Sequence, residues 1–181
     1  YRYLTNVHVE GSDLITTDIE PGVFYNKNGI KITAFDVAHL PMDPDTEELL
    51  GLEGATFGYR VDYKGRSVVF SGDTRSLPGS KIIEISKGVD VLVHETQIPY
   101  PGDSKEAKLA NVSMIVHSSP EQVAYVFNET RPRLGIYHHI IPPETTRDQL
   151  LGMTDYDGRM EVAEDLMTLM IGDEITVGMA E

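Results

Sequence analysis

Residues 57–74, FGYRVDYKGRSVVFSGDT, decide the fold of this chain. Apolar side chains alternate with smaller or polar ones along the first part of this stretch, at Phe57, Tyr59, Val61 and Tyr63. A two-residue period is typical of a strand with one buried face. Lys64-Gly65 then forms a turn signal, and the apolar run at 68–70 returns as a second strand. The stretch therefore predicts a β-hairpin that ends in the polar residues 71–74.

Regular elements are also predicted on both sides of this hairpin. Residues 30–39 alternate as an extended segment, and SPEQ at 119–122 is typical of a capped helix start. The remaining patterns predict short helices at 80–87, 119–130 and 146–151, strands at 89–94 and 134–138, and polar loops at 41–54 and 97–111. The tail at 162–177 is compatible with helix or strand, and strands are favoured. Strands alternating with short helices predict a mixed α/β protein.

The composition is that of an ordinary globular protein. The chain has 181 residues with 40% hydrophobic and 24% charged content, enough for one domain or for part of a larger one. No apolar run approaches the roughly 20 residues of a membrane helix, so we expect a soluble protein without a membrane partner. The start at Tyr1 lacks both Met and a signal pattern. We therefore expect a missing upstream segment, and either a cytoplasmic location or export after signal removal.

The net charge and the cysteine content limit which ligands the protein is expected to bind and which residues could hold a metal. The formal net charge is −14, whereas nucleic-acid binders usually carry a basic face. The chain has no cysteine, so a metal site would have to use His, Asp and Glu. A strongly acidic surface counts against a polynucleotide substrate, although it leaves room for a local basic patch.

Several potential ligands fall at or just past the ends of predicted strands: His39, Asp73, His94, Glu95, His138 and His139. Functional groups gather at strand ends in α/β proteins, and imidazole with carboxylate suits hydrolytic zinc. Each residue alone has a plainer explanation, since Asp73 suits a turn and His94 with Glu95 suits a structural pair. Their number in one short chain favours a metal site.

The ordered motifs resemble those of metallo-β-lactamase-fold hydrolases, and of their ribonuclease Z and arylsulfatase branch in particular. Residues 32–39 with 57–61 look like the third metal motif, 67–74 like the fourth, 89–96 like the His-Glu element, 117–122 like the His-Ser/Thr motif and 133–140 like the final ligand motif. The resemblance runs from about residue 21 to residue 141. It implies an αββα sandwich, of which residues 1–181 would be the C-terminal portion and mainly the second half.

The resemblance also implies a set of metal ligands. His39 would bind a first metal, Asp73 would bridge two metals, and His139 would bind the second, with His138 as the alternative. Thr74 would orient the strand end or the bridging carboxylate. The implied cofactor is Zn²⁺, two per complete site, with Mn²⁺ or Fe²⁺ as substitutes.

Two further residues acquire catalytic roles through the same resemblance. His117 would stand near the leaving group, and Glu95 would fix its tautomer as part of a proton relay. His94 is expected to pack or hydrogen-bond within the structure, and His8 to lie on the surface.

One family feature is missing. The main ligand motif, His-x-His-x-Asp-His, occurs nowhere in the chain, and the segment at 7–13 has the wrong spacing. We expect that the chain is a fragment of a longer protein, because the later motifs are intact.

The implied function is hydrolysis of a small phosphate, sulfate or carboxylic ester by a metal-bound hydroxide. One alternative is a tRNA 3′-processing endonuclease, which salt-dependent RNA binding would reveal. Another is a catalytically inactive binding module, which an intact upstream ligand motif would exclude. The expected partner is a small-molecule ester rather than nucleic acid, and a homodimer is compatible with the family.

Overall fold

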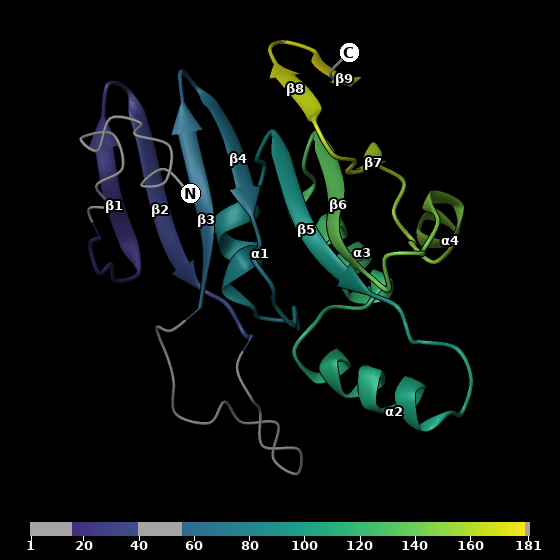
Figure 1. Ribbon diagram of the computed structural model, residues 1–181. Coiled ribbons are helices and arrows are strands. Elements are labelled where there is room, and N and C mark those ends of the chain that lie inside the picture. The colour runs from purple at the N-terminus through teal and green to yellow at the C-terminus, as the bar shows by residue number, and fades with distance from the viewer. Residues whose placement is uncertain (1–15, 40–55, 180–181) are drawn as a thin grey trace, which may run out of the picture.

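A computed structural model of the chain describes residues 16–39 and 56–179, in which seven strands form one mixed sheet (Figure 1). The strands follow chain order across the sheet: β1 (Gly22–Lys27), β2 (Ile30–Asp36), β3 (Phe57–Tyr63), β4 (Arg66–Phe70), β5 (Val91–Gln97), β6 (Leu134–Ile141) and β7 (Met160–Val162). Neighbours from β1 to β4 are antiparallel, and those from β4 to β7 are parallel.

The hairpin predicted at 57–74 is confirmed. β3 and β4 pair antiparallel, with Tyr63 opposite Arg66. The two turn residues Lys64 and Gly65 have φ of 49° and 75°. Positive φ at both central residues matches the right-handed twist of the strands and closes two-residue hairpins. The sequence Lys-Gly therefore sets the register of this pair.

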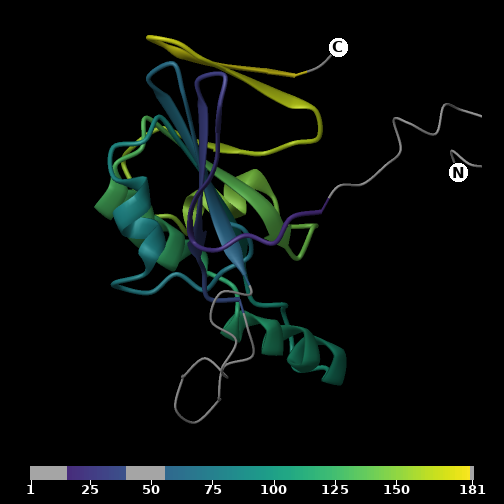
Figure 2. The same ribbon diagram turned by 90° about the vertical axis from the view of Figure 1, so that its left-hand side faces the viewer.

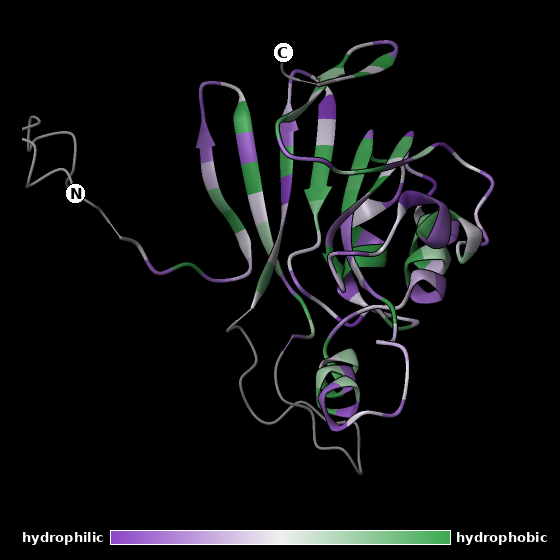
Figure 3. Cartoon of the chain, turned by 45° about the vertical axis from the view of Figure 1, so that its right-hand side comes forward, coloured by the Kyte–Doolittle hydropathy of each residue, from purple (hydrophilic) through white to green (hydrophobic). Residues whose placement is uncertain are grey.

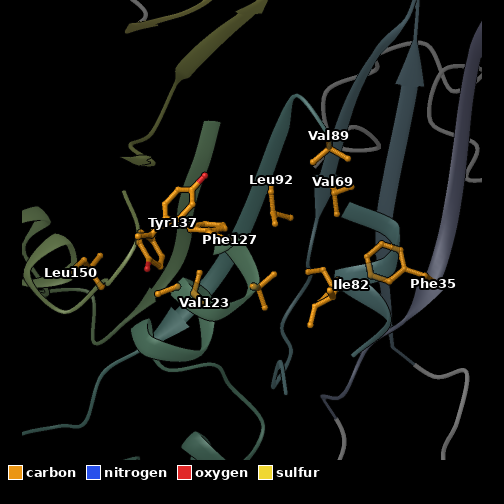
Figure 4. Close-up of a cluster of buried hydrophobic side chains, with 13 residues drawn as sticks. Phe35, Val69, Ile82, Val89, Leu92, Val123, Phe127, Tyr137 and Leu150 are labelled. Atoms are coloured by element: carbon orange, nitrogen blue, oxygen red, sulfur yellow. The ribbon is translucent and has the colours of Figure 1, made fainter. Parts of the chain in front are cut away.

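One face of the sheet packs against helices. α1 (Lys81–Ser86) and α3 (Pro120–Thr130) both lie on this face, as Figure 2 shows. Their apolar side chains meet those of the strands in a buried cluster, drawn in Figure 4, that includes Phe35, Val69, Ile82, Leu92, Val123, Phe127 and Tyr137. Figure 3 shows hydrophobic segments running through the middle of the sheet. Burial of this helix-facing surface holds the parallel strands in place.

The helix ends follow the sequence signals. Ser119 and Gln122 form the predicted capping box, and α3 ends at Thr130 as expected. α1 lies within the predicted 80–87 helix, and Gly88 after it has φ of 65°. α4 (Arg147–Gly152) occupies the third predicted helix and is capped by Thr146.

The opposite face is partly covered by the C-terminal residues. β8 (Met167–Ile171) and β9 (Ile175–Met179) form an antiparallel hairpin, which confirms strands in the 162–177 region. Ile175 packs there against Val93 and Ile136 of the sheet. Arg133 links this hairpin to the residue before β5. It forms an ion pair with Asp90 and donates hydrogen bonds to backbone oxygens of the turn between β8 and β9.

The prediction of a loop throughout 97–111 was wrong for its second half. α2 (Lys105–Asn111) is a helix, continued by the 3₁₀ turn η3 (Val112–Ile115). Pro101 and Gly102 suggested a loop, but the next residues, KEAKLA, are strong helix formers and Ser104 caps them by accepting from the Ala107 amide. The 41–54 loop and His8 lie outside the described residues.

The mixed α/β class is thus confirmed, with one large sheet and helices α1 and α3 on one of its faces. Among the described helices, none has the length and apolar character needed to cross a membrane.

Gly58 provides a test of the packing between β3 and the helix-facing cluster. A Cβ at this position would lie 2.4 Å from the Phe35 ring and 2.9 Å from the Ser71 carbonyl oxygen. We expect Gly58→Ala to lower the free energy of unfolding by about 1–3 kcal/mol, because backbone as well as ring must shift. Gly152→Ala is the matched control, since nothing lies within 4 Å of its Cβ. Urea titration of both variants measures the difference, and equal stabilities would contradict this packing.

Candidate metal centre

The predicted site residues lie at one edge of the sheet. β2, β4, β5 and β6 all run in the same direction, because two antiparallel pairings separate β2 from β4 and the later pairings are parallel. Their carboxyl ends therefore meet at the lower edge in Figure 1. His39 follows β2, Asp73 follows β4, and Glu95 and His139 belong to the ends of β5 and β6. Residues distant in sequence are thus neighbours in space.

Asp73 lies at the centre of this group. Its Oδ2 atom is 3.8 Å from Nε2 of His39 and 3.3 Å from Nε2 of His139. The His117 ring lies beside both imidazoles, with centroid distances of 4.9 Å to His39 and 5.6 Å to His139. One ligand atom each from His39, Asp73 and His117 fall within 4.8 Å of one another. Four side chains therefore converge, and proximity alone does not separate ligand from catalyst for His117.

His139 reaches this group through an irregularity in β6. His138 pairs with Glu95 and Ile140 with Thr96, so His139 is an extra residue without an opposite partner. Its φ is 44°, a left-handed conformation that is uncommon for residues other than glycine. A bulge of this kind re-aims a side chain, and here the re-aimed imidazole is the one beside Asp73. Nε2 of His138, by contrast, is buried without a hydrogen-bond partner among the described residues.

The loops after β2 and β4 are tied together directly beside the predicted ligands. Thr74 Oγ1 accepts a hydrogen bond from the Ala38 amide at 3.1 Å, and the Arg75 amide donates to the Ala38 carbonyl at 2.7 Å. These two bonds flank His39 and Asp73 in sequence. They hold the backbone segments that carry these two residues side by side.

Glu95 is fully buried beneath the cluster. Its Oε1 accepts from the backbone amides of Thr74 at 3.2 Å and Ser118 at 2.8 Å, and its Oε2 lies 3.1 Å from Nδ1 of His117. A carboxylate accepts only, so Nδ1 carries the proton and Nε2 remains available on the other side of the ring. The hydrogen bond with Glu95 raises the pKa of His117 above its ordinary value, and the charges of Glu95 and Asp73 act in the same direction against burial.

His94 points to the opposite face from Glu95. Its Nδ1 donates to the Glu95 carbonyl at 2.7 Å, and its Nε2 lies 2.9 Å from Ser76 Oγ, while its ring meets Phe127 edge-on. Burial lowers the pKa of His94, so the side chain is held neutral. This is the structural role expected for His94.

Three buried serines, for which no role was predicted, hydrogen-bond around Thr74 and Glu95. They are Ser71, Ser76 and Ser118. Ser118 Oγ donates to the Thr74 carbonyl and accepts from the Ser76 amide, and Ser71 Oγ accepts from the Glu95 amide. Each serine is a direct or near neighbour of a predicted site residue in sequence. Their closeness in sequence to the predicted site residues is the one signal that could have identified them.

The donor set fits a divalent transition metal. Zinc binds imidazole nitrogen and carboxylate oxygen at about 2.0–2.2 Å, and a tetrahedral arrangement at those distances separates its ligand atoms by roughly 3.3–3.6 Å. The 3.3 Å spacing between Asp73 and His139 falls in that range, and the 3.8 Å spacing between Asp73 and His39 is slightly longer. Imidazole and carboxylate also suit Fe²⁺ and Mn²⁺.

Comparison with known proteins gives a consistent result. The family described as the beta-lactamase superfamily domain matches residues 4–140. A ribonuclease Z from Mycobacterium tuberculosis is 26% identical over 156 residues, which cover 80% of this chain and 50% of that protein. The chain thus spans about half the length of this curated relative.

Solved structures share the fold at low sequence identity. The metallo-beta-lactamase fold protein YhfI from Bacillus subtilis superimposes with a TM-score of 0.54 at 16% identity, covering 77% of this chain and 49% of that one. A putative metal-dependent hydrolase from Parabacteroides distasonis gives 0.54 at 16% identity, with coverages of 80% and 56%. The predicted metallo-β-lactamase fold is confirmed.

The burial of neutral His94 predicts a pH dependence of stability. Its pKa is lowered in the folded state relative to 6.5, so the unfolded chain binds more protons below that pH. This contribution to stability is complete above pH 6.5 and is lost as the pH falls toward the folded value. We expect His94→Gln, whose amide can still reach Ser76, to reduce the loss of stability on acidification. Urea titrations of both proteins across this range measure it, and parallel pH profiles would contradict the assignment.

Proposed function

The chain belongs to the beta-lactamase superfamily, and from that membership we propose that the protein is a metal-dependent hydrolase acting at the site around Asp73. The observation that carries the proposal is the convergence of His39, Asp73 and His139, with His117 held on the buried carboxylate of Glu95. We further propose that residues 1–181 form the C-terminal portion of a single domain. The match to this chain covers about half of the length of the ribonuclease Z relative, which supports the proposal that the domain is longer than residues 1–181.

His39, Asp73 and His139 would hold the metal ions, proposed as two Zn²⁺ with Mn²⁺ or Fe²⁺ as substitutes. The central carboxylate lies between the two imidazoles, which suits a ligand shared by two ions. When bound, such ions act as Lewis acids and lower the pKa of water from about 15.7 toward 7. The half-exposed position of Asp73 leaves the cluster open to substrate.

Proton transfer is assigned to His117. The oxygen of an attacking water forms a bond to the phosphorus, sulfur or acyl carbon of the ester, and one water proton is released to solvent. The bond to the leaving oxygen breaks, its electron pair stays on that oxygen, and His117 supplies the proton. Glu95 fixes the tautomer of His117, and the raised pKa keeps the imidazole protonated closer to neutral pH.

Two substrate classes follow from these features. The first is a small phosphate, sulfate or carboxylic ester, which agrees with the net charge of −14. The second is the 3′ end of a precursor tRNA, which the ribonuclease Z relative favours at 26% identity. A salt-dependent RNA-binding assay distinguishes them, because phosphate contacts give a steep loss of affinity with salt.

Loss of a proposed ligand should remove both metal and activity. We expect Asp73→Ala and His139→Ala in the full-length protein to abolish hydrolysis of bis(p-nitrophenyl) phosphate and to lower the bound metal measured by mass spectrometry. Asp165→Ala, an exposed carboxylate in the turn before β8, is the control and should change neither. Full activity and metal content in both ligand variants would end this assignment.

His117→Ala should separate catalysis from metal binding. We expect turnover to fall by about 10²- to 10⁴-fold, the usual contribution of general acid catalysis, while bound metal stays near the wild-type level. Glu95→Gln should give a smaller loss, because an amide can still accept from Nδ1. If His117→Ala instead releases metal, His117 is a ligand, as its distance from His39 and Asp73 allows.

A further inference from the structure

A second feature of the site is a hollow beside His117. Its volume is about 320 Å³. The residues that line it are Arg75, Met114, Ile115, His117, Ser119 and Gln122. His117 is therefore shared by the two features, because its ring lines the hollow and also lies 4.9 Å and 5.6 Å from the ring centroids of His39 and His139.

The hollow has an apolar wall. Met114 and Ile115 come from η3, which with α2 lies beyond the carboxyl edge of the sheet in both Figure 1 and Figure 2. Ser119 and Gln122 are polar, but each is engaged with the other in the capping box of α3. The surface that remains for a ligand is chiefly the two apolar side chains, with the Arg75 guanidinium among the lining groups.

We propose that this hollow receives the leaving group of the substrate and selects leaving groups with an apolar body, such as an aryl group. The inference rests on the proposed function, because it places the reacting centre at Asp73. A group departing from that centre past the proton donor His117 enters the space that His117 also lines. The leaving oxygen keeps the electron pair of the broken bond and takes the His117 proton, so the product that occupies the hollow is a neutral alcohol or phenol.

The size and charge of the hollow favour this occupant over a nucleotide chain. Small-molecule sites range from about 300 to 1,000 Å³, and the hollow lies at the lower end of that range. Among the described residues that line it, Arg75 carries the only fixed charge. Polynucleotides gain affinity from many phosphate contacts, for which one arginine does not suffice.

The test uses the metal-loaded full-length protein and two readouts. The first is the dissociation constant of p-nitrophenol, measured by saturation-transfer NMR, and the second is kcat/KM for bis(p-nitrophenyl) phosphate. Met114→Ser and Ile115→Ser remove the apolar wall, whereas Leu109→Ser removes a solvent-exposed apolar side chain of α2 that does not line the hollow. All three positions are partly exposed, so the variants should fold.

We expect both wall variants to weaken p-nitrophenol binding and to lower kcat/KM by about five- to twentyfold, with metal content unchanged. Leu109→Ser should stay within about twofold of the wild type. If the protein hydrolyses the ester and both wall variants equal the wild type in p-nitrophenol affinity and in kcat/KM, the leaving-group assignment is overturned. An effect of Leu109→Ser as large as theirs would overturn it as well. Binding of p-nitrophenol that depends on Met114 and Ile115, without any ester hydrolysis, would instead refute the proposed function while supporting a pocket for apolar ligands.

Discussion

The geometry of the site depends on the buried carboxylate of Glu95. It accepts hydrogen bonds from the Thr74 and Ser118 amides and from the His117 ring, and so joins the loop after β4, the strand β5 and the start of α3. A buried charge is costly unless its partners are in place, which makes this arrangement specific as well as stable. Two of those partners are adjacent to the proposed chemistry, because Thr74 follows Asp73 and Ser118 follows His117. The contact that folds these loops therefore also positions the functional side chains.

Alternation along β5 lets two neighbouring residues serve different purposes. His94 faces the helices, where it contacts Ser76 and Phe127 and burial lowers its pKa, and Glu95 faces the site. The end of β6 breaks the same rule, since the bulge at His139 turns an extra imidazole toward Asp73. A strained backbone at a strand end is a common device where a side chain must be aimed. The hollow beside His117, whose apolar wall comes from η3, is the proposed site for the leaving group.

Much of this architecture was predictable because it rests on local patterns. Two-residue alternation predicted the β3–β4 hairpin, and a capping box predicted the start of α3. The strand-end positions of His39, Asp73 and His139 predicted their convergence, since strands of one direction end at one edge. His139 was favoured over His138 from the sequence, but the direction in which its ring points depends on a backbone dihedral that no local pattern gives. Two features escaped prediction. The serine contacts span more than 20 residues, and the helix at α2 was masked by the Pro-Gly signal before it.

We propose that side chains from separate strand ends form one divalent-metal site. Anomalous diffraction at the zinc edge, from crystals of the full-length protein grown with Zn²⁺, tests it most directly. We expect anomalous peaks at which Nε2 of His39, a carboxylate oxygen of Asp73 and Nε2 of His139 each lie about 2.0–2.2 Å from a metal. Zinc peaks confined to other residues, or an absence of zinc at Asp73 in well-ordered density, would contradict it.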